Sequence, residues 1–120
     1  MTVNEYQYKA MRTRSHTPFV ILNNKDAIHK AELLEGLMGL NGEAGECVDI
    51  LKKHIFQGHD VDREHLASEL GDVAWYLAMS AYAIGYDLES IFKINIEKLK
   101  KRYPNGFESE KSLNRDKNDI

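Results

Sequence analysis

The chain has 120 residues, of which 42% are hydrophobic, and its 16 basic and 19 acidic residues give a net charge of −3. This length indicates one domain with a buried core, and the absence of a basic excess speaks against a nucleic-acid partner. The longest apolar run, residues 73–84, is too short to cross a membrane, and with one cysteine and no apolar leader we expect a protein of the reducing cytoplasm.

The first predicted element is a short helix over residues 5–13. Asn4 and Gln7 have the spacing of a capping box at its start. Residues 15–25 then form a loop. Its small apolar run, residues 19–22, has no obvious partner strand, and we expect it to be an ordered segment that packs on the helices.

Three longer helices follow, over residues 26–56, from 60 or 62 to about 84, and over 88–102. Each begins near an aspartate, which favours N-caps, and two of them stop at a glycine. The expected caps are Asp26, Asp60 or Asp62, and Asp87, and the stopping glycines are Gly58 and Gly85. The sequence therefore predicts an all-α helical bundle of about four helices in one domain, residues 1–107, followed by a polar, disordered tail, residues 108–120.

Apolar residues recur at helical spacing on the three longer helices, which indicates one core-facing stripe on each. On the second helix this stripe is Leu33, Leu37, Leu40, Ala44, Cys47, Leu51 and Ile55. The apolar content exceeds what a single thin layer of helices needs. We therefore expect subunit packing, as a homodimer or homotetramer, to complete the core.

Four acidic residues form two matched pairs, Glu43-x-x-Glu46 and Glu69-x-x-Asp72. At this spacing both carboxylates of a pair project from one helix face, where like charges repel each other. Both pairs flank the apolar stripe of their helix, so antiparallel packing would line one cleft with them. Oxygen ligands of this kind suit Mg²⁺ or Mn²⁺, often with a polyphosphate as a further ligand. The alternative interpretation is that these are solvated residues at the edge of the core.

Other polar and aromatic residues lie near the same edges. Asn95, Lys98 and Arg102 border the apolar stripe of the fourth helix, where they could hold phosphate oxygens, although basic residues near a helix C-terminus often only favour the dipole. Trp75 and Tyr76 follow the second acidic pair and could stack on a base, although such aromatics are more often part of a core.

Glycine recurs every third residue in the second helix, at Gly36, Gly39, Gly42 and Gly45. Each glycine costs a helix up to about 1 kcal/mol relative to alanine, so some compensation is expected. Tight packing between helices would explain at least half of them. Gly39 lies on the acidic edge, where it could leave room for a nucleotide.

Three stretches of the chain resemble the MazG-like family of all-α nucleoside triphosphate pyrophosphohydrolases: GLNGEAGE at residues 39–46, ELGDV at 69–73 and KLKKRYPNGF at 98–107. The resemblance implies Mg²⁺-dependent hydrolysis of a nucleoside or deoxynucleoside triphosphate to the monophosphate and pyrophosphate, which would clean or balance nucleotide pools. It also implies roles for individual residues. The Mg²⁺ ligands would be Glu43, Glu46, Glu69 and Asp72, the general base would be Glu43 or Glu46, and the phosphate or sugar contacts would be Lys53, Asn95 and Lys98.

Two other classes of protein fit part of the pattern. A non-catalytic nucleotide-binding or dimerisation module would share the fold, but it would keep the repulsive carboxylate pairs without a stabilising partner. A carboxylate-bridged di-iron bundle would need Glu-x-x-His motifs on two helices. No such motif occurs at matching positions in this chain.

Overall fold

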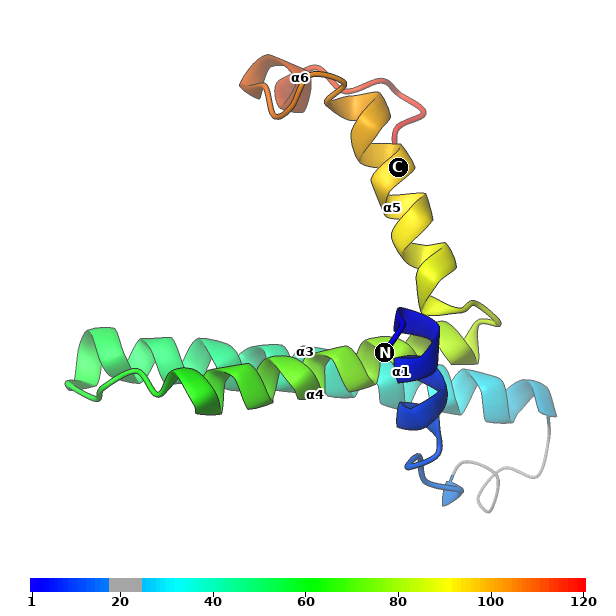
Figure 1. Ribbon diagram of the computed structural model, residues 1–120, viewed down its shortest axis with the longest axis vertical. Helices are drawn as coiled ribbons and strands as arrows, with labels where there is room; N and C mark the ends of the chain where they lie inside the picture. The colour runs from blue at the N-terminus through cyan, green and yellow to red at the C-terminus, as the bar shows by residue number, and fades with distance from the viewer. Residues whose placement is uncertain (18–24) are drawn as a thin grey trace.

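The computed structural model describes residues 1–17 and 25–120. Its elements are all helices: α1 (Val3–Met11), α3 (Lys25–Gln57), α4 (Arg63–Ala83), α5 (Leu88–Arg102) and α6 (Ser109–Leu113) (Figure 1). No strand occurs within the described ranges. These helices confirm the predicted all-α class. The apolar run at residues 19–22 lies outside the described residues.

A long helical pair forms the body of the molecule. Helices α3 and α4 run side by side in opposite directions, and α1 lies across α4 (Figure 1). Helix α5 leaves the end of α4 and rises away from the pair, and α6 lies near the far end of α5. The chain is therefore extended, with a radius of gyration of 17.8 Å, whereas a compact domain of this length would have about 14 Å.

Two aspartates begin their helices as predicted. The Asp62 carboxylate accepts hydrogen bonds from the backbone of Glu64 and His65, and Asp87 accepts one from Ser90. Helix α3 begins at Lys25, one residue before the aspartate expected to cap it. Helix α4 ends before Gly85, whose φ of +79° suits glycine.

The capping box of α1 is not the predicted one. Thr2 and Glu5 form it: the Glu5 amide donates to Thr2 Oγ1 at 3.1 Å and the Thr2 amide donates to Glu5 Oε2 at 2.6 Å. Asn4 and Gln7, which have the same spacing, bond instead to the turn after α4 and to the first residues of α5. Spacing alone did not distinguish the two pairs, because both offer a cap residue followed by a carboxylate or amide three positions later.

The buried core lies where α1 crosses the C-terminal half of α4 and the start of α5. Its members are small or flexible apolar side chains, and aromatic side chains of α1 and α4 pack against it. The buried cluster consists of Ala10, Met11, Ala78, Met79, Ala81 and Leu88. Gln7, also buried, makes polar contacts in this region.

Helix α3 carries two stripes rather than the predicted one. The inner stripe, which is buried or half-buried, consists of Leu33, Gly36, Leu40, Glu43, Cys47 and Ile50. The outer stripe is exposed and consists of Leu34, Leu37, Asn41, Ala44, Val48, Leu51 and Ile55. Leu37, Ala44, Leu51 and Ile55 were predicted to be core residues, and in the single chain they are not. Both stripes have helical spacing, so periodicity did not indicate which of them faces α4.

Residues 108–120, predicted to be disordered, contain α6 and return to α5. The return is made by an ion pair in which Arg102 Nε donates to Asp119 Oδ2 at 2.7 Å. The prediction rested on the near absence of apolar residues, and composition does not reveal one ion pair between residues 17 positions apart. Across the described helices, none is long and apolar enough to cross a membrane.

Candidate functional site

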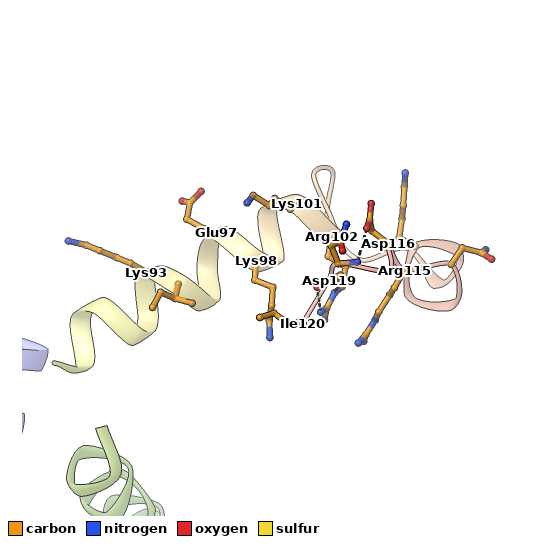
Figure 2. A pocket seen from close by; sticks show the side chains of 13 residues that line it. Lys93, Glu97, Lys98, Lys101, Arg102, Arg115, Asp116, Asp119 and Ile120 are labelled. Atoms are coloured by element: carbon orange, nitrogen blue, oxygen red, sulfur yellow. Dashed lines mark hydrogen bonds and ion pairs between the residues drawn. The ribbon is translucent and has the colours of Figure 1, made fainter. Parts of the chain in front are cut away.

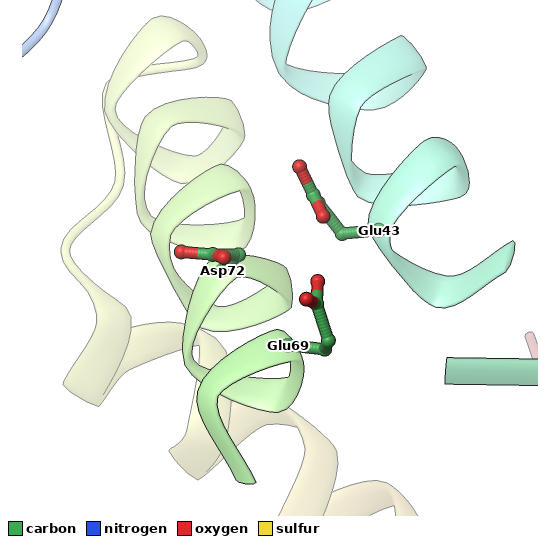
Figure 3. A group of neighbouring side chains, drawn as sticks. All are labelled: Glu43, Glu69 and Asp72. Atoms are coloured by element: carbon green, nitrogen blue, oxygen red, sulfur yellow. The ribbon is translucent and has the colours of Figure 1, made fainter. Parts of the chain in front are cut away.

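Three carboxylates converge between α3 and α4. Glu43 projects from α3, and Glu69 and Asp72 project from α4, so that one oxygen of each lies within 4.8 Å of the others (Figure 3). Glu43 and Glu69 are half-buried and Asp72 is exposed. We refer to these three residues as the acidic cluster. Their convergence follows from the antiparallel packing, because Glu43 belongs to the inner stripe that faces α4.

Glycines let the two helices approach closely beside the acidic cluster. A Cβ atom added to Gly36 would lie 2.5 Å from Ser80 Oγ, and one added to Gly39 would overlap the ring of Tyr76. Packing therefore accounts for these two glycines, and the space at Gly39 is filled by Tyr76 rather than left for a nucleotide. Gly42 and Gly45 have no neighbouring atom within 4 Å of such a Cβ.

The acidic cluster is electrostatically unfavourable without a cation. The pKa of Glu43 is raised, first because burial penalises its charge, and then because Asp72 and Glu69 carry the same charge. Among the described residues, no lysine or arginine forms an ion pair with Glu43, Glu69 or Asp72. A set of hard oxygen donors with no lysine or arginine partner fits a divalent cation such as Mg²⁺.

Glu46, the fourth acidic residue of the pattern, is exposed on α3 and is not among the three that converge. Its charge still contributes to the raised pKa of Glu43. Lys53 lies further along α3, where its Nζ is 2.8 Å from Asp49 Oδ2. Hydrogen bonds from Lys53 and Lys52 lower the pKa of Asp49 to about 2.

Helix α5 does not bring its polar residues to the acidic cluster of the same chain. Asn95 is exposed on α5, which rises away from the α3–α4 pair (Figure 1). Lys98 and Arg102 line a separate pocket, between α5 and the segment that follows it. The guanidinium of Arg102 is bound to Asp119.

The two aromatic candidates lie on α4 immediately beyond Asp72. The Trp75 indole donates to the Ala10 carbonyl at 3.2 Å and to Thr13 Oγ1 at 2.9 Å, so it ties α4 to α1. The Tyr76 ring packs edge-on against Trp75, at 5.0 Å between centroids. Both side chains are half-buried beside the core.

Two neighbours of the acidic cluster were not singled out as site residues from the sequence. His65 Nε2 lies 2.9 Å from Glu69 Oε1. Its position four residues before Glu69 puts it on the same helix face, a signal that could have found it. The pKa of Tyr6 is raised, first by burial and then by the charge of the nearby Asp72. Tyr6 comes from α1, and no local pattern links it to α4.

Comparison with known proteins gives two matches. Residues 32–107 match the MazG nucleotide pyrophosphohydrolase domain. The Gene 37 protein of Mycobacterium phage L5 is 38% identical over 81 residues, which cover 61% of this chain and 71% of the phage protein. No solved structure matches the chain significantly.

Proposed function

Because the chain belongs to the MazG nucleotide pyrophosphohydrolase family, we propose that it hydrolyses a nucleoside or deoxynucleoside triphosphate to the monophosphate and pyrophosphate. The observation that carries the proposal is the convergence of Glu43, Glu69 and Asp72, with no lysine or arginine paired to them among the described residues. The activity would clean or balance nucleotide pools, which implies action in the cytoplasm.

In this proposal Glu43, Glu69 and Asp72 hold Mg²⁺, and Mn²⁺ is a plausible substitute because it prefers the same oxygen donors. When bound, the metal supplies Lewis-acid polarisation of the phosphate and stabilises the leaving pyrophosphate. Glu46 completes the ligand set from the next turn of α3. The proton of the attacking water goes to a carboxylate that the metal does not fully engage, and Glu46, which lies outside the three converging carboxylates, is the better placed of the two glutamates for this role.

The proposed enzyme is a homodimer or homotetramer. The chain exposes 9252 Å², roughly 2,600 Å² more than is usual for a folded monomer of its mass. Summed over two chains, an excess of that size is at the upper end of the area buried in obligate dimers, about 2,000–5,000 Å². The outer stripe of α3, apolar except for Asn41, supplies a face for a second copy, with Val48 67% exposed and Leu51 51% exposed.

A second copy would also complete the substrate site. We propose that Asn95, Lys98 and Arg102 contact phosphate oxygens held at the acidic cluster of another copy, since α5 projects away from the cluster of its own chain. Lys53 would contact the phosphate or sugar from α3. Trp75 and Tyr76, beyond Asp72 on α4, would form the wall beside the base.

The test is to incubate the protein with canonical and modified NTPs and dNTPs, in Mg²⁺, in Mn²⁺ and in EDTA, and to separate the products by ion-exchange chromatography. The proposal predicts monophosphate and pyrophosphate in equal amounts, with metal and not with EDTA. Diphosphate and orthophosphate would indicate a different hydrolase. Absence of any product, with folded protein, would favour a non-catalytic nucleotide-binding module.

A further inference from the structure

Glu69, one of the three carboxylates of the acidic cluster, has a histidine one turn before it on α4. The Nε2 atom of His65 lies 2.9 Å from Glu69 Oε1, within hydrogen-bond distance. Side chains on a helix lean toward its N-terminus, so Glu69 reaches back over the turn that holds His65. Because an ionised carboxylate only accepts hydrogen bonds, the imidazole is the donor and Nε2 carries the proton.

The turn that carries His65 is fixed at the start of α4. Asp62 is the N-cap of this helix, and its Oδ1 atom accepts hydrogen bonds from the amides of Glu64 and His65, both at 3.1 Å. The cap satisfies backbone donors that the first turn would otherwise leave without partners. The imidazole of His65 is 57% exposed, but it extends from this defined position toward Glu69, whose side chain is only 19% exposed.

Asp119, a carboxylate that is enclosed to a similar degree, has a different kind of partner. It accepts hydrogen bonds from Arg102 Nε at 2.7 Å and from Arg102 Nη2 at 2.8 Å, and its side chain is 15% exposed (Figure 2). A guanidinium group is always charged, so it neutralises the carboxylate that it binds. An imidazole can donate a hydrogen bond while it is neutral, which leaves the negative charge of Glu69 available to a cation.

His65 itself lies outside the acidic cluster. Its ring nitrogens are not among the atoms of Glu43, Glu69 and Asp72 that lie within 4.8 Å of one another. These three carboxylates repel one another when no cation is bound, and a glutamate side chain is long enough to relieve that repulsion by turning toward solvent. A hydrogen bond to one oxygen of Glu69 opposes this movement, as partners of metal-binding carboxylates do in general.

We propose that His65 is a positioning residue for the metal centre, whose Nε2–H group holds Glu69 in the orientation that binds a divalent cation. The inference rests on the proposed function, in which Glu69 is a metal ligand. The simpler alternative is an exposed pair of side chains that adds a little to the stability of α4. The two differ in what they affect, because a positioning residue changes the affinity for the cation and a surface pair changes only the unfolding of the metal-free protein.

The test is titration of the full chain with Mn²⁺ alone at pH 8, without nucleotide, with free Mn²⁺ measured by electron paramagnetic resonance. Wild type is compared with His65→Leu, which removes the donor, and with His65→Gln, which keeps a side-chain N–H group. His29→Leu is the matched control, because His29 is an exposed histidine near the start of α3. Urea unfolding of the same proteins in EDTA measures any structural effect of the substitutions.

His65→Leu should raise the Mn²⁺ dissociation constant about 10-fold or more, the loss typical for a partner of a metal ligand. His65→Gln should stay closer to wild type than to His65→Leu, and His29→Leu should match wild type. Equal affinities of His65→Leu and wild type, no rescue by His65→Gln, or a urea midpoint of His65→Leu in EDTA below that of His29→Leu would overturn the positioning role alone. A wild-type protein that binds no Mn²⁺ would overturn the proposed metal centre as well, so the two failures are distinguishable.

A second measurement locates the imidazole proton in the wild-type chain. Nuclear magnetic resonance of ring-¹⁵N-labelled protein at pH 8 should show the proton of His65 on Nε2, both in EDTA and in saturating Mg²⁺. A proton that moves to Nδ1 when Mg²⁺ is added would mean that Nε2 binds the metal directly. A proton shared between the two nitrogens in EDTA would mean that no lasting bond to Glu69 exists. Either result would overturn the positioning role.

Discussion

Gly39 and Gly42 lie three residues apart in α3 and have opposite surroundings. An added Cβ at Gly39 meets the ring of Tyr76, whereas one at Gly42 meets nothing within 4 Å. Gly39→Ala should therefore destabilise the protein by about 1–3 kcal/mol through overpacking. Gly42→Ala should be neutral or should stabilise the helix by up to about 1 kcal/mol. Equilibrium unfolding in urea measures both, and equal effects of the two variants would contradict the packing assigned to Gly39.

The raised pKa of Glu43 predicts a pH dependence of stability in metal-free protein. A carboxyl group whose pKa is higher in the folded state binds its proton more tightly when folded, so it favours folding at lower pH. As the pH falls from 8 toward 4.5, the ordinary pKa of a glutamate, the free energy of unfolding in EDTA should gain a favourable contribution from Glu43 once the folded protein binds the proton. Glu43→Gln should lack this contribution and be relatively more stable at pH 8.

The measurement is the difference between wild type and Glu43→Gln in urea unfolding across this pH range. The difference isolates Glu43 from the other titrating groups, provided that these titrate alike in both proteins. At pH 8, saturating Mg²⁺ should raise the free energy of unfolding of wild type to that of Glu43→Gln or above it, because a cation would offset the repulsion among the three carboxylates. A constant difference between the two proteins at every pH would contradict a raised pKa.

At the residue scale, spacing anticipated part of the acidic cluster. The two i, i+3 pairs identified Glu43, Glu69 and Asp72 because a helix converts that spacing into one face. Spacing could not reveal that Glu46 stays outside the three converging carboxylates, since this depends on where α3 meets α4. Tyr6 could not be found at all, because its proximity to Asp72 depends on how α1 crosses α4.

At the scale of elements, Gln7 joins α1 to the end of α4 and the start of α5. Its Nε2 donates to the carbonyls of Ala78 and Tyr86, at 3.3 and 3.1 Å, and its Oε1 accepts from the Leu88 amide at 3.0 Å. The side chain is 7% exposed, so its removal would leave buried backbone groups without partners. These three bonds therefore hold the first helix in place.

Gln7→Ala should lower the free energy of unfolding by about 1–3 kcal/mol for the unsatisfied backbone groups. Lys9→Ala, an exposed position on the same helix, is the matched control and should change it by less than about 0.5 kcal/mol. Differential scanning calorimetry measures both variants. A Gln7→Ala protein as stable as wild type would mean that water satisfies these groups and that Gln7 does not join the elements.

Helix positions were predicted from the sequence more closely than helix contacts. Asp62 and Asp87 begin α4 and α5 as predicted, because an N-cap is a local interaction between a side chain and nearby amides. The core face of α3 was predicted only in part. Its inner and outer stripes are both regularly spaced, and the choice between them depends on a neighbouring helix that local sequence does not specify.

At the scale of the whole molecule, the exposed area predicts association through the outer stripe. Val48→Glu would place a charge in the centre of that apolar face, so it should shift the protein toward monomers. Val48→Ile keeps the face apolar and should leave the assembly unchanged. Sedimentation velocity over a range of concentrations measures the distribution. A wild-type protein that is monomeric at high micromolar concentration would contradict the proposed dimer.

Only part of the whole-molecule arrangement followed from the sequence. Composition alone indicated more apolar residues than one layer of helices needs, because that excess depends only on the total number of apolar residues. Composition did not reveal that α5 projects away from the α3–α4 pair, or that the segment 108–120 returns through Asp119. The first depends on the direction of the turn after α4, and the second depends on one long-range ion pair.

The most direct test of the central claim, that the acidic cluster is the metal centre of a pyrophosphohydrolase, is pyrophosphate release by Glu69→Gln in saturating Mg²⁺. Glu64→Gln, a matched charge removal on an exposed residue of the same helix, is the control. Loss of even an indirect partner of a metal ligand typically costs about 10–100-fold, so Glu69→Gln should lose at least about 100-fold with an unchanged helical circular dichroism spectrum, and Glu64→Gln should keep its rate. A Glu69→Gln protein that releases pyrophosphate as fast as wild type would contradict the account.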